Sequence, residues 1–125
     1  MRLFCFLTVL SSIIFLSFNR QQHPLHKKWQ LVAERMTYFN LDHTPYEEGR
    51  ERLDSVKNVT VQFLPDGSFQ SPEGNGSYTL SKDSIYLNLN GKKTAFKYEV
   101  NNSKLMIESY IKRPEYLIRS RLYLE

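Results

Sequence analysis

The histidines are the residues of this chain that come nearest to metal chemistry. There are three of them, His23, His26 and His43. A zinc site needs neutral imidazoles held by a rigid frame, whereas His23 and His26 lie in an N-terminal linker and His43 lies in a long connection. The single cysteine, Cys5, lies in an apolar N-terminal segment, so the remainder of the chain has no thiolate to offer as a ligand. We therefore predict no metal site and no cofactor.

Acidic residues cluster at Glu47, Glu48 and Glu51. Paired carboxylates can act as general acid and base, but Arg50 and Arg52 lie among these three, which is the pattern of a solvated surface of mixed charge. The sequence has no serine in a nucleophile-elbow motif and no glycine-rich phosphate loop. We therefore expect a protein without enzymatic activity.

Aromatic residues point to a different chemistry, the binding of a small apolar molecule. If the chain alternates as β-strands do, one set of rings shares the inward face, together with a few hydroxyl groups. The rings are Phe63, Phe69, Tyr78, Phe96, Tyr98 and Tyr116, and the hydroxyl groups belong to Thr94, Ser109 and Ser120. Such rings can line a ligand pocket whose polar groups orient the guest, or they can simply fill a small eight-stranded barrel. Both interpretations stay open here.

Tyrosines on the outward face offer an alternative function. Tyr86, Tyr110 and Tyr123 fall on the opposite parity, and exposed tyrosines are common at protein interfaces. A filled barrel could use this outer surface to contact a protein or a glycan at the cell envelope. Nucleic acid is not an expected partner, because the basic residues are scattered and do not form the stripe that such binding needs.

The elements that must position these residues are short alternating strands joined by tight turns. A three-residue turn at Pro65-Asp66-Gly67 and a two-residue turn at Asn90-Gly91 have the residue types that hairpins require. With these turns, and with four-residue loops at 81–84 and 101–104, every hairpin keeps its apolar residues on one side. The predicted pairs are Phe63 with Phe69, Tyr78 with Leu87, Leu80 with Ile85, Ile85 with Phe96, Leu87 with Thr94, and Tyr98 with Ile107.

The strand count indicates the architecture. A first strand begins at Trp29 and can extend to Tyr38, and a last strand covers residues 116–125, so the total is about eight. We predict an all-β, antiparallel up-and-down barrel, since closure removes exposed edges. A two-sheet sandwich is the alternative.

One helix is expected between the first two strands. Thr44-Pro45-Tyr46-Glu47 has the pattern of a capping box with proline at the first helical position. This pattern predicts a short helix over residues 45–55, which would serve either as a lid over the barrel mouth or as a plain connection.

The N-terminal segment predicts export. An apolar run over residues 3–18 follows Arg2, and as a helix it would span about 24 Å, less than a bilayer core of about 30 Å. We expect residues 1–20 to be a signal peptide, with an uncleaved membrane-anchor helix as the alternative, residues 21–28 a linker and residues 29–125 the domain. The predicted location is the periplasm, the cell envelope or the medium. A lipoprotein is not expected, because Cys5 lies near the start of the apolar run.

The order of these segments resembles the bacterial lipocalin-like domain family. The segments that carry the resemblance are Trp29-Gln30-Leu31-Val32, residues 61–69, Gly76-Ser77-Tyr78-Thr79-Leu80, Asp83-Ser84-Ile85-Tyr86-Leu87 and Lys104-Leu105-Met106-Ile107. The resemblance implies a barrel, export, a small apolar ligand and no enzymatic activity. Lipocalins proper begin with Gly-x-Trp and place an arginine of the last strand over the tryptophan. By this resemblance Trp29 closes the barrel, Lys27 stands at the glycine position, and Arg119 or Arg121 supplies the cation over the ring.

Overall fold

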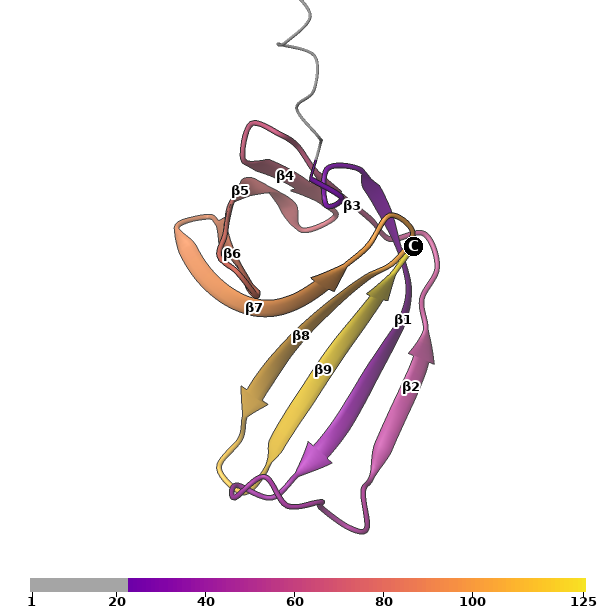
Figure 1. Cartoon of the computed structure of the whole chain (residues 1–125). Helices are drawn as coiled ribbons and strands as arrows, with labels where there is room; N and C mark the ends of the chain where they lie inside the picture. Colours follow the sequence, from indigo (N-terminus) through magenta and orange to yellow (C-terminus); the bar gives the residue numbers. More distant parts are fainter. Residues whose placement is uncertain (1–22) are drawn as a thin grey trace, which may run out of the picture.

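A computed structural model describes residues 23–125, so the predicted N-terminal signal or anchor helix lies outside the described residues. The described chain forms nine strands in one sheet and no helix, and none of it could cross a membrane as a helix. The strands are β1 (Lys28–Phe39), β2 (Glu51–Ser55), β3 (Thr60–Phe63), β4 (Ser68–Ser71), β5 (Gly74–Leu80), β6 (Ser84–Leu89), β7 (Lys92–Val100), β8 (Leu105–Lys112) and β9 (Leu117–Leu124). Eight of them, β1 and β3 to β9, close into an antiparallel barrel because β1 also pairs with β9 (Figure 1). The predicted all-β, eight-stranded up-and-down barrel is confirmed.

The hairpin registers agree with the alternation in the sequence. Phe63 pairs with Phe69, Leu80 with Ile85, and Tyr98 with Ile107, as predicted. The turns have the expected chemistry, since Asn90 and Gly91 both have positive φ angles, 53° and 78°, as a type I′ hairpin requires. Local turn geometry and the two-residue period of the strands therefore agree on one register.

The helix predicted over residues 45–55 is wrong. Glu47, Glu48 and Gly49 have φ angles of 45°, 60° and 89°, which a right-handed helix cannot accommodate. The chain instead forms β2, which pairs antiparallel with β1 over Ala33–Thr37. An isolated short helix is only marginally stable, whereas the free edge of the long strand β1 offers a full set of hydrogen-bond partners. The tertiary partner therefore prevails over the local capping signal, and the lid that this helix would have formed is absent from the described residues.

The length of β1 gives the molecule two parts. Its first residues, Lys28–Gln30, pair with β3, and Ala33–Thr37 pair with β2 along the same edge. Below the ring of strands, β2 and the distal parts of β1, β9 and β8 continue as a four-stranded sheet, the extension sheet (Figure 1). Its inner face continues the inner wall of the barrel.

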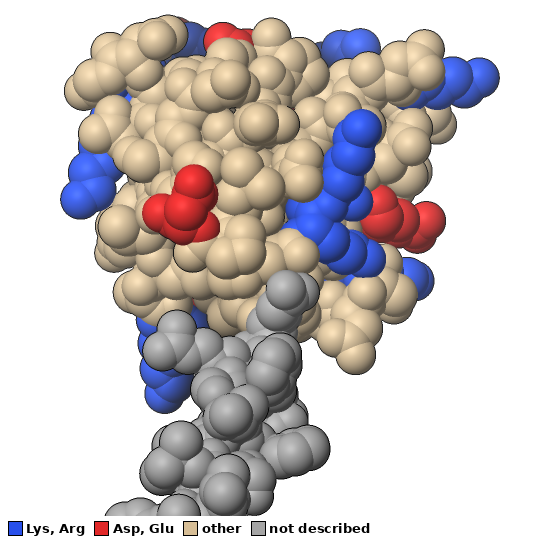
Figure 2. Space-filling model, turned by 90° about the horizontal axis from the view of Figure 1, so that it is seen from above, with Lys and Arg blue, Asp and Glu red and all other residues tan. Residues whose placement is uncertain are grey.

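The opposite end of the barrel, the closed end, is filled by side chains. Leu25, Trp29 and Phe63 are almost completely buried there with Ile85 and Leu105, and the Trp29 indole N–H donates a hydrogen bond to the Leu25 carbonyl oxygen at 3.0 Å. This contact anchors the segment before β1 inside the barrel. Seen from above the barrel, the charged side chains are scattered among uncharged ones (Figure 2).

The cation over Trp29 is Lys27 rather than an arginine of the last strand. The Lys27 ammonium lies 4.0 Å from the centre of the indole ring. Arg119 lies over Phe39 instead, and Arg121 pairs with Glu108 at 2.7 Å. Both arginines lie on the outer face, because they alternate with the inward residues of β9, so neither can reach a ring inside the barrel.

Candidate functional site

The barrel contains a cavity of about 540 Å³ between the closed end and the extension sheet. Its walls are mostly apolar and come from every strand of the barrel except β5, with polar groups from Ser71, Glu73, Lys92 and Thr94 where the cavity opens. Cavities that bind small molecules have volumes of roughly 300–1,000 Å³ and apolar walls with a few polar groups. In size and lining, this space is suitable for a small apolar molecule.

The cavity exists because the aromatic rings gather at the closed end. Phe63 lies 5.2 Å from Tyr78 and 6.3 Å from Phe69, measured between ring centres. Phe69 packs over Gly76, where an added Cβ would lie 2.8 Å from the Phe69 ring, so the glycine leaves room for the ring. Below this cluster the inner wall consists largely of aliphatic side chains such as Leu87 and Leu122. The cavity lies between these side chains.

Four of the nine proposed ligand-contacting residues border this cavity. Phe63, Phe69 and Phe96 line its wall, and Thr94 lies at its open end, where it is exposed to solvent although it points inward. Exposure of an inward residue is direct evidence that the barrel is open at this end. Phe96 is the one of these rings that is not fully buried, since Phe63 and Phe69 also belong to the closed-end cluster.

The other proposed residues lie elsewhere on the inner surface. Tyr78 belongs to the closed end, where its hydroxyl group donates a 2.6 Å hydrogen bond to the Leu64 carbonyl oxygen, and burial raises its pKa. Tyr98 packs against the core without lining the cavity. Tyr116 lies at the far end of the extension sheet, 5.9 Å from the ring of Tyr38.

Ser120 and Ser109 face each other across β8 and β9 on the inner face of the extension sheet. Ser120 is 6% exposed and donates a 3.0 Å hydrogen bond to a carboxylate oxygen of Glu34. Together with Glu34, these hydroxyl groups form a polar band directly below the apolar wall of the cavity.

Sequence reasoning missed Glu34. Alternation from Trp29 and Leu31 would place residue 34 on the outside, but the register of β1 against β9 shifts between Leu31 and Ala33. This bulge turns Glu34 inward, as bulges do when they re-aim a side chain. A signal was present, because apolar residues occupy odd positions at the start of β1 and even positions at Met36 and Tyr38.

Sequence reasoning also missed Leu25. It lies in the predicted linker, yet it is 0% exposed. The segment carries no strand period, so alternation could not identify a buried residue there. His23 stabilises its position, because the His23 Nδ1 accepts a hydrogen bond from the Leu25 amide at 3.1 Å. Burial, and then the neighbouring His26, lower the pKa of His23.

The charges on the inner face of the extension sheet are unbalanced. Glu34 lies directly opposite Asp54 of β2, and Asp54 already pairs with Arg52 at 2.9 Å. No ion pair to Glu34 is found among residues 23–125. Its hydrogen-bond partner is the neutral hydroxyl group of Ser120, so no basic side chain of the described residues pairs with this carboxylate near the cavity.

A second hollow, of about 710 Å³, lies at the surface between the β7–β8 turn and the C-terminal residue. Charged residues such as Glu99, Lys104 and Glu125 are prominent in its lining, which does not suit an apolar guest.

Within the described part of the chain there is no group of three or more metal-ligating side chains. The chain matches no protein-family model, no curated protein and no solved structure.

Proposed function

We propose that this protein is an exported, non-enzymatic, lipocalin-like carrier that holds a small apolar molecule inside its barrel. The observation that carries the proposal is the apolar cavity of about 540 Å³, which is sealed at one end by the Trp29 cluster and open at the other. The predicted signal segment supports export, and the order of strands supports the lipocalin-like assignment.

Binding would be driven by removal of apolar surface from water. A ligand that buries about 200 Å² of such surface would gain roughly 5 kcal/mol, at about 25 cal/mol per Å², before the entropic cost of association is subtracted. The guest would enter past Thr94 and Lys92 and would rest against the Phe96 ring. The closed end need not move, so the binding cost would not include its rearrangement.

Native mass spectrometry tests this proposal. The predicted mature chain, residues 21–125, contains all nine strands and would be purified without organic solvent and measured beside a denatured control. We expect an excess mass on the folded protein that disappears on denaturation, or saturable binding of an added alkyl probe. A clean mass together with no binding of any apolar probe would contradict a carrier function.

The alternative function, an envelope interaction module, is favoured by exposed apolar side chains on the extension sheet. Leu53, Tyr110 and Ile111 are 58%, 47% and 36% exposed. By contrast, the rings of Tyr86 and Tyr123 are each covered by a basic side chain. A photo-crosslinking residue at position 110 would capture a partner in the native envelope if this module exists, and a clean result there would count against it.

A further inference from the structure

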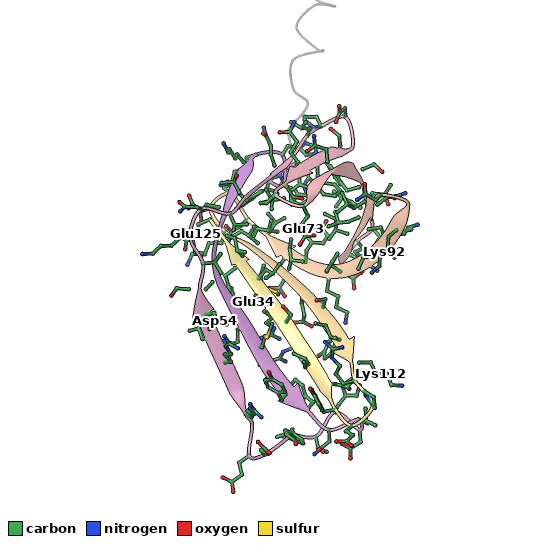
Figure 3. The ribbon with its side chains drawn as sticks, turned by 180° about the vertical axis from the view of Figure 1, so that it is seen from behind. Glu34, Asp54, Glu73, Lys92, Lys112 and Glu125 are labelled. Atoms are coloured by element: carbon green, nitrogen blue, oxygen red, sulfur yellow. The ribbon has the colours of Figure 1, made fainter. Side chains whose placement is uncertain are left out.

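The polar band below the cavity suggests which chemical class of guest the barrel holds. Glu34 pairs in register with Leu122, and Leu122 lines the cavity wall. The two side chains share the inner face, so the Glu34 carboxylate is one cross-strand neighbour away from the apolar wall. Figure 3 labels Glu34 on the extension sheet, with Glu73 and Lys92 above it on the barrel.

No basic side chain forms an ion pair with Glu34 within residues 23–125. Ser120 donates one hydrogen bond to Glu34 at 3.0 Å. Arg52 of the neighbouring strand β2 forms its ion pair with Asp54, the residue opposite Glu34. The Ser120 hydroxyl group is a neutral donor. A cationic donor placed here would form the stronger, charge-assisted hydrogen bond that Glu34 does not make to any side chain of residues 23–125.

We infer that the molecule held in the barrel is an amphiphile with an ammonium head group, and that Glu34 is the residue that receives this group. This inference rests on the proposed carrier function. The apolar tail fills the cavity up to the Phe63 and Phe69 rings, and the head group lies at the polar band. There it donates hydrogen bonds to Glu34 and to the hydroxyl oxygen of Ser109 or Ser120.

An anionic head group fits this end of the cavity poorly. It would meet the carboxylate of Glu34, which has no ion-pair partner within residues 23–125, beside an Asp54 that is already paired with Arg52. Lys92 could attract it, but Lys92 lies exposed at the rim of the cavity, where Glu73 is also exposed, and solvent screens exposed charges strongly. The partly buried Glu34 is therefore the charge that selects between head groups.

The test compares three probes with the same tail, dodecylammonium, dodecanol and dodecanoate, on residues 21–125 by isothermal titration calorimetry below their micelle concentrations. We expect dodecylammonium to bind at least about tenfold more tightly than dodecanoate, because hydrogen bonds between oppositely charged groups are stronger than neutral ones and the carboxylate of dodecanoate would be repelled. In Glu34→Gln this preference should disappear, because the neutral amide no longer attracts an ammonium group, while its oxygen can still accept the hydrogen bond from Ser120. Glu73→Gln is the matched control and should keep the preference.

Each outcome decides a different question. If dodecanoate binds as tightly as dodecylammonium, the ammonium inference is wrong while the carrier function stands. If Glu34→Gln keeps the preference and Glu73→Gln loses it, the head group lies at the rim and the role of Glu34 is refuted. If none of the three probes binds, the carrier function fails together with the inference. If Glu34→Gln does not fold, the ranking of the three probes on the unmodified protein still decides the head-group class.

Discussion

Truncation of Phe96 is the perturbation that separates a hollow barrel from a filled one. Both rings border the cavity, but Phe96 is only partly buried, whereas Phe63 is 1% exposed and packs against the rings of Phe69 and Tyr78. Phe63→Ala should destabilise the fold by about 3–5 kcal/mol, the usual cost of deleting a packed ring. Phe96→Ala should cost only about 1–2 kcal/mol, because the ring loses part of a full burial of about 1.5–3 kcal/mol and enlarges a space that already exists.

Urea unfolding followed by fluorescence measures both costs. Trp29 is the only tryptophan and is 0% exposed, so its emission should report the closed end directly. The expected difference between the two variants is about 2–3 kcal/mol, or roughly 10 °C or more in Tm at about 4–8 °C per kcal/mol. Binding of an alkyl probe should respond more strongly to Phe96→Ala than stability does. We expect its affinity to fall about tenfold, which corresponds to a lost contact of about 1.4 kcal/mol.

Equal destabilisation by the two substitutions would refute this reasoning. It would mean that Phe96 is packed as tightly as Phe63 in solution and that the inner wall collapses onto the space seen beside it. A tighter, rather than weaker, hold on the probe after Phe96→Ala would refute the proposed wall contact while leaving the cavity in place.

Three further substitutions test the closed end and its surroundings. Gly76→Ala should destabilise by about 3 kcal/mol or prevent folding, since its Cβ would lie 2.2 Å from the Asn88 carbonyl oxygen; a stable variant in thermal melts would contradict this packing. Burial raises the pKa of Tyr78 above its ordinary 10.0, so the folded protein holds the phenol proton more tightly than the unfolded chain does. That stabilisation is complete below pH 10.0 and is lost as the pH rises through the folded pKa; Tyr78→Phe should flatten the alkaline fall in Tm. Burial lowers the pKa of His23 below 6.5, so the stabilisation from the neutral ring is present above pH 6.5 and is lost as the pH falls through the folded pKa. Protonation removes the acceptor for the Leu25 amide, and His23→Ala should remove this acid-side loss, measured as Tm against pH.

Much of the fold was predictable because its determinants are local. The turn at Gly67 sets the pairing of Phe63 with Phe69, and the turn at Asn90-Gly91 sets the pairing of Leu87 with Thr94. The two-residue period of each strand agrees with both registers. Shifting any of these hairpins by one residue would expose its apolar face. The barrel class then follows, since a row of such hairpins with one apolar face can hide its edges by closure.

The remaining features depend on contacts that no local pattern encodes. β2 forms because the lower half of β1 has a free edge, and that edge is free because β3 pairs only with the first residues of β1. Glu34 points inward because of one bulge, which inverts the alternation beyond Leu31. The cavity also depends on where the rings lie, and the Phe69 ring can pack at the closed end because Gly76 beside it has no side chain.

The pairing of β1 with β9 has a consequence for how this chain folds. The hairpins from β3 to β8 join near neighbours in sequence, but closure joins Leu31 to Leu124, at opposite ends of the described chain. Contacts this distant carry the largest loop-closure entropy and form slowly. Until the eight residues of β9 have paired, the edges of β1 and β8 that bind β9 have unpaired backbone groups, to which other chains can bind. Completion of the C-terminal strand is thus the step that converts an aggregation-prone open sheet into a closed fold.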